Sequence, residues 1–227
     1  MVTRQPVALS PLHHQHVELG AEMELSEGWQ RPARYTSADD ELEGLRAGVG
    51  ICDVSPAGKL TVQGDGGDAL LAAAFPDAGL LSVGQAARAG GETALARLTH
   101  DEVWVTTALN QAATMAQRLS RDVQGCVHTV DVTSARAAVR IVGPRSHMLL
   151  AAVTELAVAP SAFGDRRCAQ SRFSEVHGTL VRLDTAELPD YTLYFDREYG
   201  DYMWESLLEA GERYHLTPFG TEALGKI

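Results

Sequence analysis

The stretch Asp53-Val54-Ser55-Pro56-Ala57 decides the fold, because a close copy of it, Asp131-Val132-Thr133-Ser134-Ala135, occurs just past the middle of the chain. Each stretch leads into a run typical of a strand, 59–63 or 138–142, and each run ends at a glycine. A helical pattern rich in leucine and alanine follows in both places. The recurrence of strand, glycine and helix after the same onset indicates an internal duplication.

The later parts of the two halves also correspond. Each is predicted to have a second strand and a second helix, at 102–106 and 110–119 in the first half and at 191–195 and 196–210 in the second. The first residues of these helices, Asn110 and Asp196, have side chains that can cap a helix. Other strands are predicted at 93–98 and in a hairpin of 168–173 and 179–183, with a turn at His177-Gly178. Chance similarity of short segments is the alternative explanation.

We therefore predict an α+β fold of two pseudo-repeated ferredoxin-like halves, each a split βαβ unit with helices on one face of an antiparallel sheet. The predicted boundaries are an N-terminal loop and helix segment at 1–52, a first half at 53–130 and a second half at 131–227. The N-terminal segment is expected to be rich in loops over 10–43, with a mobile polar stretch at His13, His14 and His16 and a helix at 39–47.

Composition makes several classes of function improbable. The 227 residues carry a net charge of −11, whereas a nucleic-acid-binding protein needs a basic face, so nucleic acid is not an expected partner. No apolar run approaches the ~20 residues of a membrane span and no signal peptide is recognised, so we expect a cytoplasmic protein without membrane contact. Cys52, Cys126 and Cys168 are widely spaced and are expected to be reduced thiols packed as small apolar groups. We predict no metal site.

Several blocks of the sequence match one known pattern. The most specific is Arg46-Ala47-Gly48-Val49-Gly50-Ile51-Cys52-Asp53-Val54-Ser55, and others are the opening at 10–21, Gly28-Trp29-Gln30-Arg31-Pro32, Tyr35 and Leu216-Thr217-Pro218-Phe219-Gly220. Together they resemble the folate-binding domain of the aminomethyltransferase family, which comprises the glycine-cleavage T-protein and its relatives. The C-terminal half of the sarcosine oxidase α subunit and the γ subunit of that enzyme are similar to a comparable degree.

The resemblance implies tetrahydrofolate as cofactor and aminomethyl or methyl transfer from a small-molecule amine to folate. A folate nitrogen is then the nucleophile, and a protein carboxylate orients it and stabilises positive charge on the carbon unit. A T-protein continues beyond the equivalent of Ile227 into a C-terminal barrel domain, which this chain is expected to lack. A partner subunit or a second copy would then complete the cleft, as in a multi-subunit amine demethylase or a split aminomethyltransferase.

The resemblance also implies roles for five residues. The family's Gly-Gly-x-x-Asp-Asp segment corresponds to Gly90-Gly91-Glu92, which implies Glu92 as the catalytic carboxylate, although a solvated residue before a strand fits equally. Glu187 is implied as the acceptor for the pterin edge, or it lies in a surface turn. Arg182 would meet the folate tail or form a salt bridge with a local acid. Tyr191 would line the pterin or lie in the core, and Asn110 would contact the ligand or cap a helix.

Two other functions stay open at the level of the sequence. The chain could be a non-catalytic assembly subunit that resembles sarcosine oxidase γ, and the loss of the family's paired aspartates favours this. The fold could also serve unrelated small-molecule chemistry, because a fold does not determine a function. The well-matched N-terminal block favours the folate hypothesis over both.

Overall fold

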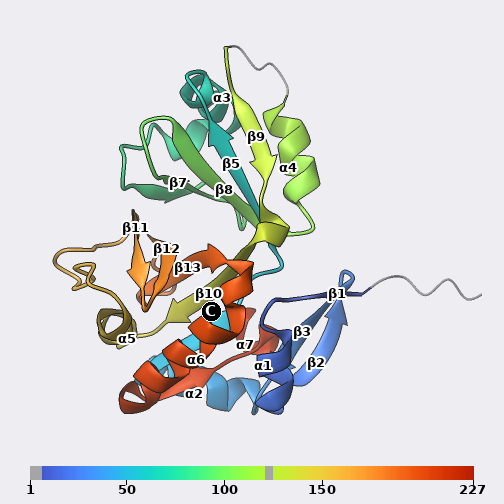
Figure 1. Ribbon diagram of the computed structural model, residues 1–227, viewed down its shortest axis with the longest axis vertical. Helices are drawn as coiled ribbons and strands as arrows, with labels where there is room; N and C mark the ends of the chain where they lie inside the picture. The colour runs from blue at the N-terminus through green and yellow to red at the C-terminus, as the bar shows by residue number, and fades with distance from the viewer. Residues whose placement is uncertain (1–6, 121–124) are drawn as a thin grey trace, which may run out of the picture.

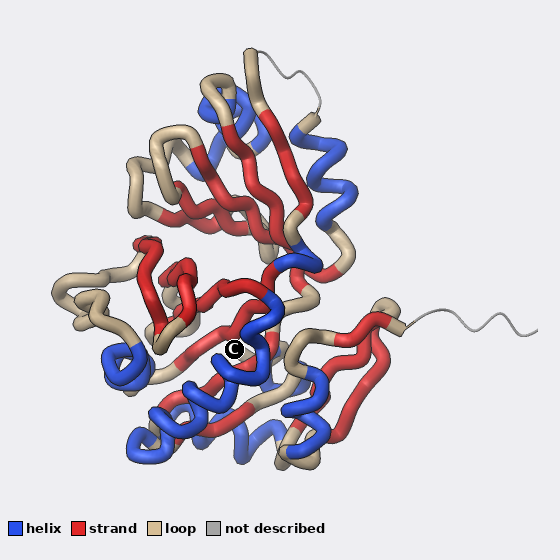
Figure 2. The backbone as a smooth tube through the Cα atoms, viewed as in Figure 1, coloured by secondary structure: helices blue, strands red, loops and turns tan. Residues whose placement is uncertain are grey.

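A computed structural model describes residues 7–120 and 125–227. Figure 1 shows two packed units, with the predicted first half above and the predicted second half, joined by the N-terminal segment, below. The strands form one three-stranded sheet and two larger sheets of six and five strands. Figure 2 shows that both units contain helices that lie beside their strands. The fold therefore combines helices and sheets in each unit.

The N-terminal segment is more regular than the sequence predicts. Its elements are β1 (Ala8–Leu9), α1 (His13–Glu18), β2 (Glu22–Ser26), β3 (Trp29–Arg34), α2 (Ala38–Ala47) and β4 (Val49–Asp53). The prediction of loops over 10–43 is wrong because β2 and β3 pair through a tight turn at Glu27-Gly28, where both residues have positive φ. The predicted helix begins one residue early as α2, and Ser37 caps it by accepting a bond from Asp40 N at 3.1 Å.

The first half forms the five-stranded sheet. Its elements are β5 (Ala57–Gln63), α3 (Gly67–Ala74), a 3-10 turn (Pro76–Ala78), β6 (Ala86–Arg88), β7 (Ala94–Arg97), β8 (Glu102–Leu109), α4 (Ala112–Leu119) and β9 (His128–Asp131). The order is β6-β7-β8-β5-β9, and all neighbours are antiparallel. Apart from the short edge strand β6, this is the order of a split βαβ unit. One face packs on α3 and α4 and buries Leu60, Val105 and Leu119.

The second half forms most of the six-stranded sheet. Its elements are β10 (Arg136–Val142), α5 (Ser146–Val153), β11 (Arg167–Phe173), β12 (Val176–Arg182), β13 (Asp190–Asp196), α6 (Gly200–Gly211), β14 (Leu216–Pro218) and α7 (Thr221–Leu224). The order is β11-β12-β13-β10-β4-β14. The N-terminal strand β4 thus lies beside β10, in the place that β9 occupies beside β5 in the other sheet. One face packs on α5 and α6 and buries Val139, Leu193 and Trp204.

The two related stretches of sequence are the two crossings between these sheets. The chain passes from β4 to β5 through the first stretch, and from β9 to β10 through the second. In the first, Asp53 Oδ1 accepts a bond from Ser55 N at 2.8 Å, and in the second Asp131 Oδ1 accepts from Thr133 N at 2.9 Å. Both crossings are therefore closed by the same aspartate-centred turn.

Each crossing is also fastened to the opposite sheet in the same way. The hydroxyl of Ser55 accepts a bond from Ala138 N in β10, and the hydroxyl of Thr133 accepts one from Lys59 N in β5, both at 3.0 Å. The backbone repeats the pattern, because Val54 N donates to the carbonyl of Ala138 and the equivalent valine after β9 donates to the carbonyl of Lys59. The two connections therefore have equivalent hydrogen bonds as well as similar sequences.

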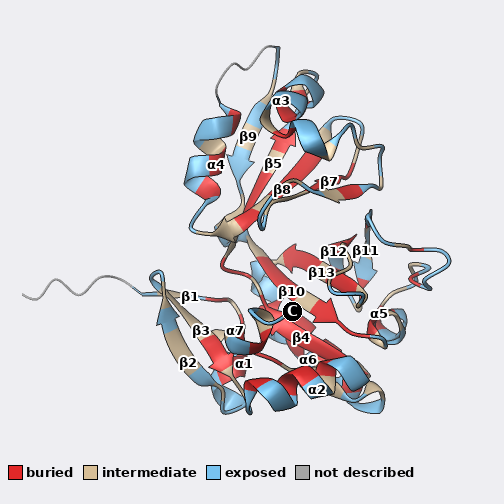
Figure 3. Cartoon of the chain, turned by 180° about the vertical axis from the view of Figure 1, so that it is seen from behind, coloured by how far each residue is buried: buried red, intermediate tan, exposed pale blue. Residues whose placement is uncertain are grey.

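The remaining faces of the two larger sheets pack on each other. Their contact layer combines small side chains with two aromatic ones, Trp104 and Tyr194, whose rings meet edge-on at 5.4 Å. Figure 3 shows buried residues along the central strands of both units. The sheet edges also touch, because Cys168 N donates to the carbonyl of Gly84 at 2.9 Å and Gln85 forms a bridge with Arg167.

Local details correct three of the predictions. Asn110 and Asp196 do not cap their helices, because α4 begins at Ala112 and α6 at Gly200 after a 3-10 turn. The predicted hairpin turns at Ser174-Glu175 instead of His177-Gly178. Gly178 lies within β12, where a Cβ atom would come within 3.0 Å of neighbouring side chains and of a backbone oxygen. This glycine therefore permits close packing and does not form a turn.

The helices and the cysteines can be compared with the expectations from composition. None of the helices in the described part of the chain has the length and apolar character that crossing a membrane requires. Burial raises the pKa of Cys52 to about 12 and that of Cys168 to about 11. Cys126 is exposed, so the prediction that all three thiols are packed inside is wrong for this one.

Candidate functional site

The N-terminal block converges on one buried carboxylate. Asp53 accepts hydrogen bonds from Ser10 Oγ and, at 3.0 Å, from the ring of His16. The other ring nitrogen of His16 lies 2.7 Å from the hydroxyl of Tyr35. The ring itself is fully buried, with the Trp204 ring edge-on at 5.1 Å. The prediction of a mobile stretch is therefore wrong for His16, which joins α1 to the end of β4.

The electrostatics of this network favour an anchor. Burial alone would raise the pKa of Asp53, but hydrogen bonding and charge from His16 and bonds from Ser10 and Ser55 outweigh it and lower that pKa. Asp53 is thus an anion whose oxygens are already bonded to protein donors. Because neither Asp53 nor His16 reaches solvent, the network holds the N-terminal segment on the six-stranded sheet and exposes no reactive atom.

A second buried charge lies between the two crossings. Lys59 is 1% exposed, and its Nζ donates to the carbonyls of Ser55 and Ala57, both at 2.7 Å. Burial lowers the pKa of Lys59 to about 8, although the carboxylates of Asp53 and Asp131 partly oppose this. The amine therefore stabilises the first crossing through its carbonyls and is closed to ligands.

A polar cluster joins the two halves at one end of the contact layer. Arg140 in β10 holds Asp190 in β13 with both Nε, at 3.0 Å, and Nη2, at 2.5 Å. Thr185 Oγ1 donates to the same carboxylate at 2.8 Å. Arg88, at the end of β6 in the other sheet, donates through Nη2 to Thr185 Oγ1 at 2.5 Å and to the carbonyl of Leu183 at 2.9 Å. Four charged or polar side chains thus form one chain across the halves.

The interior of the contact layer is filled beside this cluster. Trp104 and Tyr194 occupy its centre, and the guanidinium of Arg136 lies 5.7 Å from the Trp104 ring centre. Burial raises the pKa of Tyr194 to about 12, so its hydroxyl is protonated at neutral pH. Because aromatic side chains fill the interior, a ligand can reach only the polar groups at the rim of the layer.

Glu92 lies in the turn between β6 and β7. Gly90 and Gly91 both have positive φ, and Thr93 N donates to the carbonyl of Gly90 at 3.1 Å, so the turn is tight. The side chain of Glu92 is exposed and forms no hydrogen bond within the described residues. This geometry is that of the solvated residue that the sequence also allowed.

Asn110 lies at the same end of the five-stranded sheet, directly after β8. It has a φ of 56°. Its side-chain amide contacts the N-terminal hairpin, because Nδ2 donates to the carbonyl of Glu27 at 2.8 Å. Glu27 also has positive φ, so two turn residues meet tip to tip. Asn110 thus ties the first half to the N-terminal sheet.

Arg182 and Tyr191 are neighbours across β12 and β13 on the helix-covered face. Arg182 pairs with Asp184 through Nε at 2.8 Å and Nη2 at 2.9 Å, and Nη1 donates to the carbonyl of Phe163 at 2.5 Å. The guanidinium lies 5.1 Å from the centre of the Tyr191 ring. Tyr191 is fully buried, its hydroxyl has no hydrogen-bond partner among residues 7–120 and 125–227, and burial raises its pKa. The salt bridge and the core position foreseen as alternatives are those observed.

Glu187 lies at the tip of the loop between β12 and β13. Ala186 and Glu187 have φ of 49° and 65°, and two backbone bonds between Thr185 and Leu188 close the turn at 3.1 and 2.8 Å. Its side chain is exposed, as expected for a surface turn. Among the five candidates, Arg88 links the loops of Glu92 and Glu187, and Arg182 contacts Tyr191. The side chains of Arg182 and Tyr191 point to the opposite side of their sheet.

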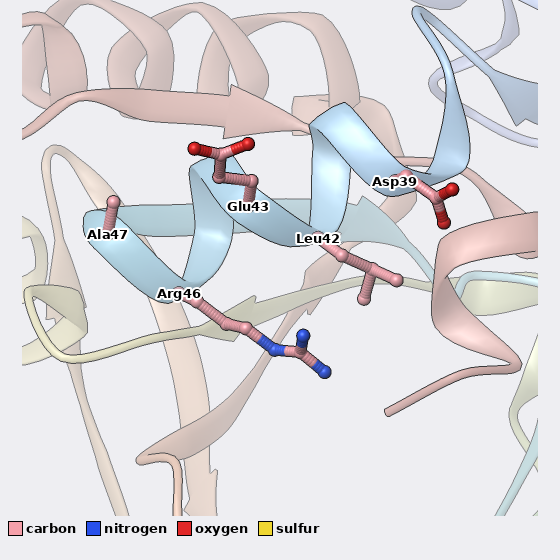
Figure 4. A pocket seen from close by; sticks show the side chains of 5 residues that line it. All are labelled: Asp39, Leu42, Glu43, Arg46 and Ala47. Carbon is pink, nitrogen blue, oxygen red and sulfur yellow. The ribbon is translucent and has the colours of Figure 1, made fainter.

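One hollow borders the β12–β13 loop, and another lies apart from the candidates on α2. One of about 200 Å³ lies between the halves and is lined by Asp77, Ala78, Ala87, Arg88, Asp165, Arg166, Leu183 and Asp184. A broader one of about 500 Å³ lies on the outer face of α2 and is lined by Asp39, Leu42, Glu43, Arg46 and Ala47. In Figure 4 Glu43 and Arg46 point in different directions, so the α2 hollow has no convergent polar set. Ligand pockets usually measure 300–1,000 Å³, so the hollow between the halves is small for a folate.

Sequence reasoning missed the residues that join the halves. Arg88, Arg140 and Asp190 lie far apart in the chain and match no motif. The sequence of β10 contains one weak signal of such a residue, because Arg140 interrupts the apolar run at 137–142. In the described ranges, no three histidine, cysteine or acidic side chains come together in a way that could hold a metal ion.

Comparisons with known proteins agree with this fold. The sarcosine oxidase subunit alpha of Rhizobium meliloti is 28% identical over 246 residues, which cover 97% of this chain and 25% of that protein. The structure of the glycine cleavage system aminomethyltransferase T of Bartonella henselae superposes with a TM-score of 0.80 at 20% identity, covering 96% of this chain and 60% of that one. This chain therefore spans only part of both proteins.

A third similar protein is close to this chain in extent. A chain of the heterotetrameric sarcosine oxidase of Corynebacterium sp. U-96, solved in complex with pyrrole 2-carboxylate, superposes with a TM-score of 0.66 at 20% identity. The match covers 91% of this chain and 95% of that one. The family model described as the GCVT N-terminal domain matches residues 12–227. Because that match includes both larger sheets and the anchored N-terminal segment, this chain belongs to the GCVT N-terminal domain family.

Proposed function

We propose that this chain supplies the folate-binding unit for one-carbon transfer from an amine to tetrahydrofolate, together with another subunit. The family match over 12–227 carries this proposal. The similar proteins named a sarcosine oxidase subunit and an aminomethyltransferase support it, and both are longer than this chain. The donor amine and the identity of the partner belong to the proposal.

The rim between the halves is the proposed ligand position. Glu92 and Glu187 stand on two exposed turns that Arg88 joins, and Arg88 and the loop residues Leu183 and Asp184 line the hollow between the halves. In the proposed reaction, Glu92 orients the attacking folate nitrogen and stabilises the cationic carbon unit, and Glu187 accepts from the pterin edge. A contact between folate and Arg182 requires that Arg182 leave Asp184. Asn110 and Tyr191 would act by shaping the neighbouring loops.

The small hollow is the reason for proposing a partner. About 200 Å³ accommodates only part of a folate molecule, so the rest of its surface must be covered from outside the chain or by movement of the two turns. Apolar side chains are available for contact with another subunit, since Leu25 is 66% exposed and Val17 53%. A partner that covers the rim would complete the cleft.

The second candidate is a non-catalytic assembly subunit. One observation favours it: the proposed carboxylate of Glu92 lies in a solvated turn and forms no hydrogen bond with the part of the chain that the structure describes. The near-complete overlap with one chain of a heterotetrameric sarcosine oxidase is compatible with this role. Folate would then not be turned over by this chain, and it need not bind at all.

We also propose that the two halves, 53–130 and 131–227, are repeats of one ancestral unit. The matching aspartate turns and the matching hydroxyl bonds of the two crossings support this. The place of β4 beside β10, and of β9 beside β5, supports a pair of units that exchanged one strand.

Isothermal titration with 5-formyltetrahydrofolate tests the ligand assignment. The protein is purified under native conditions from the cells that make it, so that a partner stays bound. Saturable heat at one site per chain is expected. No heat and no thermal shift at millimolar ligand would reject folate and leave the assembly role or unrelated chemistry.

Glu92→Gln tests the catalytic part separately. If Glu92 acts as proposed, turnover falls by roughly 10²–10⁴-fold while folate affinity is largely kept. Glu175→Gln is the matched control, because Glu175 is exposed in the hairpin turn of the second half and lies in neither candidate loop. Equal turnover in both variants would remove Glu92 from the mechanism.

A further inference from the structure

Arg88 forms a contact between the halves that no motif predicted. From the end of β6, its Nη2 donates to the carbonyl of Leu183 at 2.9 Å and to Thr185 Oγ1 at 2.5 Å, and it lies 3.4 Å from the carbonyl of Asp184. All three acceptors belong to the loop between β12 and β13. One exposed guanidinium therefore spans the opening between the sheets.

The loop that Arg88 contacts has a fixed side and a free side. On the fixed side, Thr185 Oγ1 donates to Asp190, which is 4% exposed and is held by Arg140. On the free side, Ala186 and Glu187 project into solvent. Arg88 is thus the contact that joins this loop to the other half, at a threonine whose second partner is buried.

The hairpin that carries Arg88 is fixed at its other end. Ala86 N donates to the carbonyl of Arg166, and Cys168 N donates to that of Gly84, both at 2.9 Å, so backbone bonds fasten the start of β6 to β11. At the far end of β6, immediately before the turn of Glu92, the Arg88 side chain makes the hydrogen bonds to the second half that the described residues show. Release of Arg88 would therefore free the turn and the loop from each other while the sheets stay joined.

The loop is conformationally strained. Ala186 and Glu187 are consecutive non-glycine residues with positive φ, which carries an energetic penalty for side chains of this kind. Such a turn persists when surrounding contacts hold it, here the Thr185–Leu188 bonds and the Arg88 contact to Thr185.

We propose that Arg88 is a positioning residue that holds the β12–β13 loop to the β6–β7 hairpin, a contact that we call the clasp. The clasp sets the spacing of the Glu92 and Glu187 turns. The importance of that spacing for a ligand rests on the proposed function, whereas the clasp itself rests on the contacts. The ligand that would sense the clasp is one that touches both turns, a folate in the proposed function.

Amide hydrogen exchange measured by NMR tests the clasp without any ligand. In Arg88→Ala the amides of Leu183, Thr185 and Leu188 should exchange about five-fold faster, the effect of losing roughly one net hydrogen bond. Arg118→Ala is the control, because Arg118 also donates to a backbone carbonyl, that of Ala74, but on the outer side of the first half. These three amides should keep their wild-type rates in the control.

A double-mutant cycle makes the test specific. Thr185→Val removes one of the three acceptors of Arg88 and leaves the carbonyls of Leu183 and Asp184, so Arg88→Ala should accelerate exchange less in that background than in the wild type. Wild-type rates in Arg88→Ala, or effects that simply multiply in the double variant, would overturn the clasp. Titration of 5-formyltetrahydrofolate into Arg88→Ala tests the link to binding, and a loss of affinity of about five-fold is expected. Unchanged affinity would overturn that link, and absence of binding in the wild type would reject the proposed function while the exchange result still decides the clasp.

Discussion

Lys59 shows how a single residue can set the pH behaviour of this fold. Its amine is buried between the crossings, where two backbone carbonyls accept hydrogen bonds from it and, within the described residues, it forms no salt bridge with a carboxylate. Desolvation therefore dominates, and the pKa falls to about 8. At neutral pH the folded protein carries a buried charge that the unfolded chain keeps in water.

The pH dependence of stability should reveal this residue. The pKa of Lys59 is about 8 when folded and 10.5 as a free side chain, so between these values the unfolded chain binds more protons and the lysine's contribution to stability rises with pH. The rise across the window is about 3 kcal/mol. Urea unfolding of wild type and Lys59→Met at pH 7.5, 9 and 10.5 isolates it, because other groups titrate in both proteins. A pH-independent difference between the two would contradict the assignment.

Asp53 should have the opposite dependence. Its pKa is lowered in the folded protein, so its contribution is present above the unfolded value near 3.9 and is lost as pH falls below it. Asp53→Asn removes the buried negative charge and replaces one acceptor oxygen of the network with an amide donor, and it is expected to cost about 3–5 kcal/mol at pH 7. Denaturant unfolding at pH 7 and pH 3.5 measures it, and the difference should shrink at the lower pH. A surface change such as Asp39→Asn serves as the control.

At the scale of elements, the crossings explain which predictions succeeded. Strands β5, β10, β8 and β13 were predicted because each is a short run rich in apolar, β-branched or aromatic residues, and the structure packs both faces of these strands. The partners of the first two, β4 and β9, were not predicted, because pairing between distant segments leaves no periodic signal. The N-terminal hairpin and α1 were missed for a related reason: both are short and are held by contacts such as His16 to Asp53.

The crossings also predict an unequal pair of mutational effects. Ser55 is 2% exposed and its hydroxyl bonds the backbone of Ala138 in both directions, whereas Thr133 makes the equivalent bonds to Lys59 nearer the surface. Ser55→Ala should therefore destabilise by about 1–3 kcal/mol because it removes the acceptor of the buried Ala138 amide, and Thr133→Val by less. Thermal unfolding compares them. Equal losses would show that burial does not distinguish the two crossings.

At the scale of the whole molecule, the candidate site was only partly predictable. The Gly-Gly turn and the β12–β13 loop could be located from the sequence, and both lie at the boundary of the halves. The orientation of Arg182 and Tyr191 could not, because one residue of register decides which face of a sheet a side chain occupies. Arg88, Arg140 and Asp190 come together only after the sheets pack, so no local pattern reveals them.

The exposed apolar side chains predict association. Leu9, Val17 and Leu25 are each about half exposed or more and belong to the N-terminal elements β1, α1 and β2. Light scattering on the natively purified protein should give a mass above the 24.4 kDa of one chain. A strictly monomeric protein that catalyses transfer unaided would contradict the need for a partner.

Hydrogen exchange with and without 5-formyltetrahydrofolate would locate the proposed site directly. If folate binds between the halves, the ligand should slow exchange in the turn at 89–93 and in the loop at 183–189 together. Arg88, which precedes the turn, and Leu183 and Asp184 of the loop line one hollow. Peptides from the outer face of α2, around the hollow of Figure 4, should be unchanged. Protection confined to α2, or no protection in either loop at saturating ligand, would contradict a folate site at the boundary of the two halves.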